Sequence, residues 1–93
     1  MINKNIIIIR KKLDKLDDNF LNLIKKRTKL VDEVLKNKKF KNQIIDKKRI
    51  SIILKNIVKK SKRKNIDPKI TKKIWETMIR SYIDYEFRNF KRK

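Results

Sequence analysis

Apolar residues between Ile9 and Val34 recur at alternating spacings of four and three residues, which is the pattern of a helix with one apolar face. One position of this series, between Leu23 and Leu30, holds Arg27 instead. We expect a single helix from about Ile6 to Lys38, roughly 50 Å long at 1.5 Å per residue. The apolar stripe consists of Ile9, Leu13, Leu16, Phe20, Leu23, Leu30 and Val34.

The length of this helix bears on the oligomeric state. A compact chain of this size has a radius of gyration of only about 12 Å. The helix therefore extends beyond any single chain that could cover its apolar stripe, and we predict a homodimer built on it. The four isoleucines at 6–9 leave an alternative for the first residues, because isoleucine also favours strands.

The chain has 93 residues, which suits one domain, and we expect residues 1–93 to form a single helical domain. It contains no Gly, Cys or His. Without glycine, phosphate-cradling loops and dinucleotide fingerprints are excluded, because they need backbone conformations that a side chain forbids. Without Cys and His, disulfides, thiolate nucleophiles, imidazole bases and the usual zinc ligands are excluded. Any chemistry must use Arg, Lys, Asp, Glu, Tyr, Ser or Thr.

The formal net charge of +20 raises nucleic acid as an alternative partner, since clustered lysines displace counterions from phosphate backbones. Most of the excess comes from 23 lysines in a chain that is also rich in Ile and Asn. That pattern is typical of a compositional bias, so we interpret most lysines as solvated surface. The apolar run at 6–9 is too short for a signal sequence or a membrane span. We expect a cytoplasmic protein that does not associate with membranes.

Two further helices follow the first. Apolar residues at helical spacing predict a second helix from Asp46 to Arg63, with a break near residues 59–65. Asp67 and Pro68 predict the start of a third helix, because aspartate caps free N–H groups and proline suits the first helical position. This helix is expected to continue to Phe90. The predicted fold class is all-α, with three helices per chain and a long first helix.

Several cations occupy positions that a role as solvated surface residues does not explain well. Arg27 occupies the apolar stripe, where a charge is unfavourable unless a counterion or ligand meets it. Alternatively, its aliphatic stem packs on the stripe while the guanidinium reaches water. Lys38 follows eleven residues later, about three turns, and is expected on the same side. Arg10 precedes Arg27 by seventeen residues, about 100° around the helix, and would serve a different pocket, such as the partner chain's.

The third helix also carries a carboxylate on a stripe of aromatic residues. Glu86 shares a stripe with Tyr82 and Trp75, so we expect it to be poorly solvated, either in a site or in an ion pair with an arginine. Asp46 and Arg49 are one turn apart and by themselves suggest ordinary surface pairing. Together, these charges predict a cation-lined pocket between helices for a di-anionic ligand.

The segment from Ile8 to Lys38, IIRKKLDKLDDNFLNLIKKRTKLVDEVLKNK, resembles the all-helical class of chorismate mutases. That class opens with an arginine, an L-D pair, an arginine and a lysine at these spacings. Here they are Arg10, Leu16-Asp17, Arg27 and Lys38. The similarity continues through Asp46 to Arg49, then Ile66-Asp67-Pro68 and Ile74-Trp75, to Glu86. The resemblance implies an intertwined homodimer of the chorismate mutase II type, with two active sites that each take Arg10 from the other subunit.

The resemblance also implies a role for each residue. Arg10, Arg27 and Arg49 would hold the two carboxylates of chorismate. Lys38 and Glu86 would flank the ether oxygen of the breaking C–O bond, and Glu86 could donate a hydrogen bond to it only when protonated. The rearrangement to prephenate is a pericyclic step of aromatic amino acid biosynthesis, in the shikimate pathway, and needs no nucleophile, metal or cofactor. Conformational selection and preorganised positive charge would supply the catalysis.

One position departs from the family pattern. Ile50 stands where chorismate mutases usually place a glutamate that meets the ring hydroxyl of the substrate. The related isochorismate pyruvate-lyases, which form salicylate and pyruvate, have an aliphatic residue there and a last helix similar to Tyr82-Ile83 through Phe90. Asp46 fits the mutases better. We therefore expect a chorismate mutase, with Asp46, Ile50 and Tyr82 as further substrate-binding residues, and keep the lyase as the alternative. A basic nucleic-acid-binding helical dimer is a weaker alternative, because it does not explain Arg27 or Glu86.

Overall fold

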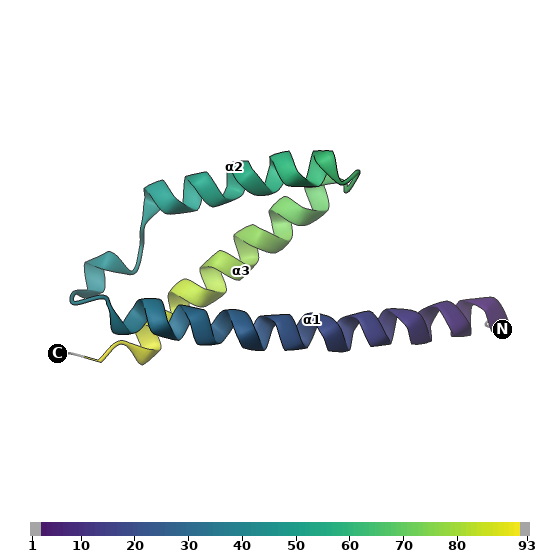
Figure 1. The fold of residues 1–93 in the computed structure, drawn as a ribbon, viewed down its shortest axis with the longest axis horizontal. Helices are drawn as coiled ribbons and strands as arrows, with labels where there is room; N and C mark the ends of the chain where they lie inside the picture. The colour runs from purple at the N-terminus through teal and green to yellow at the C-terminus, as the bar shows by residue number, and fades with distance from the viewer. Residues whose placement is uncertain (1–2, 92–93) are drawn as a thin grey trace. The chain divides into compact units, whose positions relative to one another are not determined.

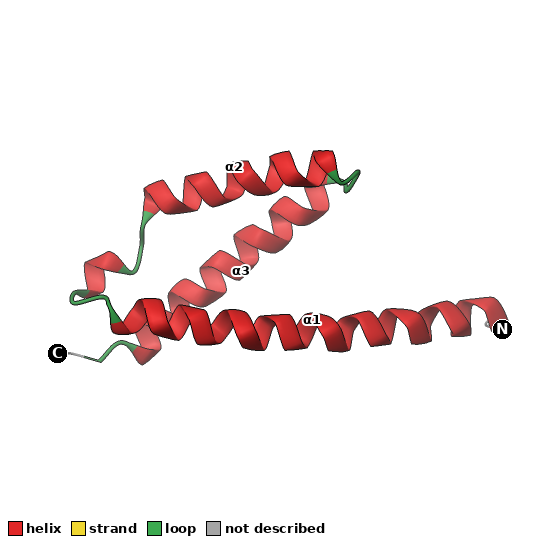
Figure 2. Ribbon diagram, viewed as in Figure 1, coloured by secondary structure: helices red, strands yellow, loops and turns green. Residues whose placement is uncertain are grey.

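A computed structural model describes residues 3–91 as three α-helices and one short 3-10 helix. Helix α1 spans Lys4–Lys36, the 3-10 helix η1 spans Lys41–Gln43, α2 spans Lys47–Arg63 and α3 spans Pro68–Asn89 (Figure 1). Within the described range there is no strand (Figure 2), which confirms the all-α class with a long first helix. None of these helices combines the length and the apolar character that crossing a membrane requires.

Helix α1 begins two residues earlier than expected. The Asn3 side chain accepts a hydrogen bond from the Asn5 backbone N–H at 2.7 Å, and the Asn3 carbonyl accepts one from Ile6 at 3.0 Å. Asparagine at this position satisfies N–H groups that a helix start leaves unpaired. The isoleucines at 6–9 are therefore helical, and the alternative of a strand at these residues is wrong. With 33 residues, α1 is about 50 Å long.

Helix α1 also ends earlier than expected, at Lys36. The backbone N–H groups of Asn37 and Lys38 donate to the carbonyls of Val34 and Leu35 at 3.0 and 3.1 Å. These are bonds to the third residue back, which tighten the last turn and close the helix. Lys38 consequently lies beyond α1, so the predicted helix end at Lys38 is wrong, and the position of Lys38 on the same side as Arg27 stays a prediction.

Two units make up the chain, with the boundary between Glu33 and Val34. The first contains α1 up to Glu33, and the second contains the last turn of α1, η1, α2 and α3. Within the second unit, α2 and α3 pack against each other and run in opposite directions (Figure 1). Their contact includes the buried Ser61, whose hydroxyl donates to the Ile57 carbonyl at 2.6 Å and lies 2.7 Å from the Thr71 hydroxyl. That a single domain covers the whole chain remains a prediction.

Aspartates start both helices of the second unit. Asp46 is the N-cap of α2 and accepts a hydrogen bond from the Arg49 backbone N–H at 2.9 Å. Asp67 is the N-cap of α3 and accepts one from the Lys69 backbone N–H at 2.9 Å, and Pro68 is the first helical residue. Both caps follow from the preference of aspartate for unpaired N–H groups at helix starts. The predicted starts of these helices are confirmed to within one residue.

Helix α2 ends at Arg63, as predicted, so the turn before α3 is shorter than the expected break at residues 59–65. The Ile66 N–H donates to the Ser61 carbonyl at 2.9 Å, and the Asn65 N–H donates to the Lys62 carbonyl at 3.2 Å. This pair of bonds is a Schellman motif, which needs a left-handed residue after the helix. Asn65 supplies it with φ of 57°. Asparagine tolerates this region better than most residues and replaces the glycine that the chain lacks.

The apolar stripe predicted from the sequence lies along α1. Each of its members remains between 49 and 61% exposed, namely Ile9, Leu13, Leu16, Phe20, Leu23, Leu30 and Val34. Water in contact with this much aliphatic and aromatic surface is unfavourable, at about 25 cal/mol per Å². The stripe is therefore a surface suited to burial against other apolar groups.

Candidate functional site

Lys38 and Glu86 form an ion pair between segments far apart in the sequence. The Lys38 Nζ donates to Glu86 Oε1 at 2.9 Å, across 48 residues. The two side chains are only 18 and 9% exposed, respectively. A carboxylate held this far from water needs a counterion, and the lysine provides it. The structure thus brings together two of the residues predicted for the site, and the predicted arginine partner of Glu86 is here a lysine.

The loop that carries Lys38 is fixed at several points. The Gln43 side-chain oxygen accepts hydrogen bonds from the backbone N–H groups of Lys39 at 2.7 Å and Phe40 at 2.9 Å. Leu35 before the loop and Ile44 after it are both buried. Two apolar anchors and a side-chain bridge therefore hold the backbone around Lys38, which limits the positions that its ammonium can take.

Glu86 is presented by the last part of α3. It is buried, and the other members of its stripe, Trp75, Ile79 and Tyr82, are partly buried, so the expectation of a poorly solvated carboxylate is confirmed. The Tyr82 ring lies edge-on to the Tyr85 ring, with centroids 6.3 Å apart and planes at 87°. Edge-to-face rings at this separation attract each other, which adds a side-chain contact to the turn of α3 before Glu86.

The remaining candidates of the second unit lie at the start of α2. Asp46 uses its carboxylate to cap the helix through the backbone of Arg49, so the expected pairing of their side chains is wrong. The Arg49 side chain is exposed, and Ile50 is partly buried. The cap ties the first turn of α2 to Asp46 and thereby fixes the point from which the arginine projects.

Arg10 and Arg27 belong to the first unit. Both lie on α1 and both are exposed, with Arg27 between Leu23 and Leu30 of the apolar stripe. Whether they join Lys38 and Glu86 in one site is a prediction of the sequence resemblance.

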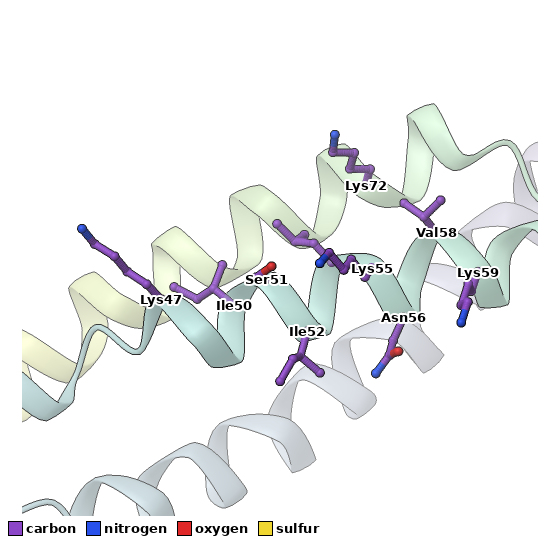
Figure 3. A pocket seen from close by; sticks show the side chains of 10 residues that line it. Lys47, Ile50, Ser51, Ile52, Lys55, Asn56, Val58, Lys59 and Lys72 are labelled. Atoms are coloured by element: carbon purple, nitrogen blue, oxygen red, sulfur yellow. The ribbon is translucent and has the colours of Figure 1, made fainter.

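A separate hollow of about 830 Å³ runs along α2 and is called here the α2 groove (Figure 3). Ile50 is the candidate residue that contributes to its lining, whereas Lys38, Arg49 and Glu86 do not. The groove is therefore a different surface from the one around the ion pair. Lysines contribute prominently to it, from both α2 and α3 (Figure 3).

Sequence reasoning missed three features of this region. It named Lys38 and Glu86 as neighbours of one ligand atom but not as a direct pair, since nothing local connects residues 48 positions apart. It missed the hydrogen bonds that the Gln43 side chain accepts, although a glutamine three residues after a helix N-cap, here Phe40, is part of a known capping pattern. It also missed the hydroxyl contact between Ser61 and Thr71.

The geometry around the ion pair is suited to electrostatic catalysis and not to covalent catalysis. A partly buried ammonium can donate to a substrate oxygen on which negative charge develops, and such stabilisation is strongest away from bulk water. A neighbouring carboxyl group can donate a second hydrogen bond when it is protonated. The pair is thus suited to polarise one oxygen atom of a bound molecule.

The long helix followed by a helical hairpin fits the all-α fold expected of the all-helical chorismate mutases. Residues 9–87 match the family described as chorismate mutase type II, and the chain belongs to this family. The match extends from the apolar stripe of α1 to the residue after Glu86. Comparison with curated proteins and with solved structures gave no match.

Proposed function

We propose that this protein catalyses the rearrangement of chorismate to prephenate in the cytoplasm, as a step of aromatic amino acid biosynthesis. The observation that carries the proposal is the contact of Lys38 Nζ with Glu86 Oε1 at 2.9 Å. These are the two residues that the family resemblance assigns to the ether oxygen of the substrate. Their proximity supports a common target atom, and their shielding from water supports a strong electrostatic effect on it.

The substrate carries two carboxylates, and the proposed site meets them with arginines. Arg27 and Arg49 of one subunit and Arg10 of its partner hold the carboxylates through paired, charge-assisted hydrogen bonds. Binding by these arginines selects the folded conformer of the substrate, in which the new C–C bond can form. Asp46 and Tyr82 complete the contacts with the substrate.

As the C–O bond breaks, negative charge grows on the ether oxygen. The Lys38 ammonium stabilises that charge, and the Glu86 carboxyl group donates a second hydrogen bond to the same oxygen when it is protonated. No atom is transferred to or from the protein, so the step requires neither a nucleophile nor a metal nor a cofactor.

A homodimer is part of the proposal. The exposed stripe of α1 supports it, because burying one Leu or Phe side chain stabilises an interface by about 1.5–3 kcal/mol. Pairing two copies through α1 would cover both stripes at once and allow Arg10 to reach the site of the other subunit.

A second activity is supported by one residue. The aliphatic Ile50 cannot accept a hydrogen bond from the ring hydroxyl of chorismate, and isochorismate pyruvate-lyases have an aliphatic residue at this position. The alternative function is therefore the elimination of pyruvate from isochorismate to leave salicylate.

The deciding experiment offers chorismate and isochorismate separately to the purified protein and identifies the products by chromatography. Prephenate from chorismate supports the mutase, and salicylate with pyruvate from isochorismate supports the lyase. No turnover of either compound, together with duplex DNA binding at physiological salt, would instead support the nucleic-acid alternative.

A further inference from the structure

The segment from Lys38 to Arg49 concentrates positive charge around two residues of the proposed site. Six of its twelve residues are Lys or Arg, and four of these have no role in the site, namely Lys39, Lys41, Lys47 and Lys48. All four side chains are exposed, and none of them forms an ion pair among residues 3–91. Each lies within three residues of Lys38 or Arg49, hence within about 11 Å along the backbone.

Carboxylates near these lysines are too few to balance them. Asp46 is the only carboxylate between Val34 and Ile66. It accepts a hydrogen bond from the Arg49 backbone N–H at 2.9 Å and caps α2, so it contributes one negative charge against six cations of the segment. The surroundings of Lys38 and Arg49 therefore keep a positive potential that reaches into the solvent.

The stability of α2 does not explain why two of these lysines start the helix. Lys47 and Lys48 are its first two residues, and its first turn contains no acidic residue. The start of a helix is the positive end of its dipole, where cations are unfavourable and anions are favourable. The two lysines therefore destabilise the first turn of α2, and a di-anion bound near Arg49 would offset that effect.

The same helix carries a second pair of consecutive exposed lysines, Lys59 and Lys60, twelve residues further along. That spacing corresponds to about 18 Å along the helix axis. Figure 3 shows Lys47 and Lys59 toward opposite ends of α2. In about 0.1 M salt, charges are screened over about 10 Å. A di-anion at Arg49 therefore interacts with the first pair of lysines much more strongly than with the second.

We propose that Lys39, Lys41, Lys47 and Lys48 attract the di-anionic substrate through the solvent and raise the rate at which it reaches the site. They act over a distance and touch neither the substrate in its bound position nor the reacting atoms. Such attraction raises kcat/KM and leaves kcat unchanged, because it ends when the substrate is bound. The inference rests on the proposed function, and it holds for chorismate and isochorismate alike, since both carry two carboxylates.

The test compares two double variants that change the net charge equally, K47Q/K48Q and K59Q/K60Q. In about 0.1 M salt, kcat/KM of K47Q/K48Q should fall about three- to fivefold, and that of the control K59Q/K60Q less than about 1.5-fold. The kcat of both variants should stay within about 1.5-fold of the wild-type value. In about 1 M salt, where screening acts over about 3 Å, kcat/KM of all three proteins should agree within about 1.5-fold.

Two further measurements separate this attraction from a structural role. Removing cations from the positive end of α2 should leave the urea midpoint of K47Q/K48Q unchanged or raise it, although its kcat/KM falls. K39Q/K41Q changes the loop on the other side of the segment, and its kcat/KM should fall about two- to threefold in about 0.1 M salt. That loss should also disappear in about 1 M salt.

Three outcomes would overturn the inference while the proposed function stands, because turnover is observed in each. The first is an unchanged kcat/KM in K47Q/K48Q, which would make these lysines ordinary solvated surface. The second is an equal loss in K59Q/K60Q, which would assign the effect to the net charge of the whole protein. The third is a loss that persists in 1 M salt, which would indicate direct contact or altered structure. Turnover of neither substrate would instead overturn the proposed function, and this inference with it.

Discussion

The Lys38 ammonium lies 2.9 Å from Glu86 Oε1 and joins the loop after α1 to the last part of α3. Each residue is the counterion of the other, and both are largely shielded from water. Changing one of them therefore affects both the electrostatics of the proposed site and the stability of the second unit.

Replacing Lys38 tests both effects together. Lys38→Ala removes the cation proposed to stabilise the ether oxygen, and kcat/KM for chorismate should fall about 100- to 1000-fold. It also leaves a buried carboxylate unpaired, so the free energy of unfolding in urea should drop by about 2 kcal/mol. Lys39→Ala is the matched control, because Lys39 is the exposed neighbour in the same loop. Equal effects of the two substitutions would contradict the assignment.

Replacing Glu86 tests its role as a hydrogen-bond donor. The carboxyl group can donate to the ether oxygen only when it carries a proton, whereas Glu86→Gln always has an N–H donor, and its amide oxygen can still accept from Lys38. The kcat/KM of Glu86→Gln for chorismate should therefore equal or exceed that of the wild-type protein. Glu86→Ala, which has no donor, should lose about tenfold or more. Equal losses of activity in the two variants would remove Glu86 from this role.

Substitutions of Ile50 distinguish the chorismate mutase reaction from the isochorismate pyruvate-lyase reaction. Ile50→Glu introduces an acceptor for the ring hydroxyl of chorismate, which should raise kcat/KM for prephenate formation about five- to tenfold. Salicylate formation from isochorismate should not increase. Ile50→Leu, which keeps the side chain aliphatic, is the control and should change prephenate formation by less than about twofold. A loss of mutase activity in Ile50→Glu, with its helix content intact, would count against the proposed position of the hydroxyl.

Mixing two inactive variants tests the shared site. If Arg10 serves the partner's site, an Arg10→Ala subunit and an Arg27→Ala subunit together form one intact site in each mixed dimer. Unfolding and refolding an equal mixture should restore about a quarter of wild-type activity, because half of the dimers are mixed and each has one complete site. Activity that stays at the level of the separate variants would show that both arginines act within one subunit.

Ser61 tests the contact between α2 and α3. Ser61→Ala removes a buried hydroxyl that bonds the Ile57 carbonyl and the Thr71 hydroxyl, and it should lower the free energy of unfolding by about 1–2 kcal/mol. Ser81→Ala is a close control, since the exposed Ser81 makes the same type of bond to the Thr77 carbonyl at 2.9 Å. Urea denaturation of both variants should show an effect of less than about 0.5 kcal/mol for Ser81→Ala.

Local sequence signals were sufficient to predict most of the fold. The apolar stripe predicted α1, and Asp67 with Pro68 predicted the start of α3, because periodicity and caps act within a few residues. The end of α1 was not predictable in the same way. The helix closes at Lys36 through bonds to the third residue back, and no proline or glycine marks that point in the sequence.

The candidate site was predictable only in part. Glu86 on an apolar stripe of α3 indicated a shielded carboxylate, and the structure has it buried. Its partner could not be read from spacing, because the contact with Lys38 depends on how the loop after α1 meets α3. Arg10 and Arg27 lie in the other unit, so their roles in the site are based on the family resemblance and not on a contact in the structure.

The separation of 48 residues between Lys38 and Glu86 also has a consequence for the order of folding. During synthesis, Lys38 and its loop are made before α2 and α3. Closing a loop of this length carries an entropic penalty that local helical contacts do not. The hairpin of α2 and α3 can form first from neighbouring residues, and the ion pair then closes last. Formation of the proposed catalytic pair should therefore be among the slowest steps of folding within the second unit.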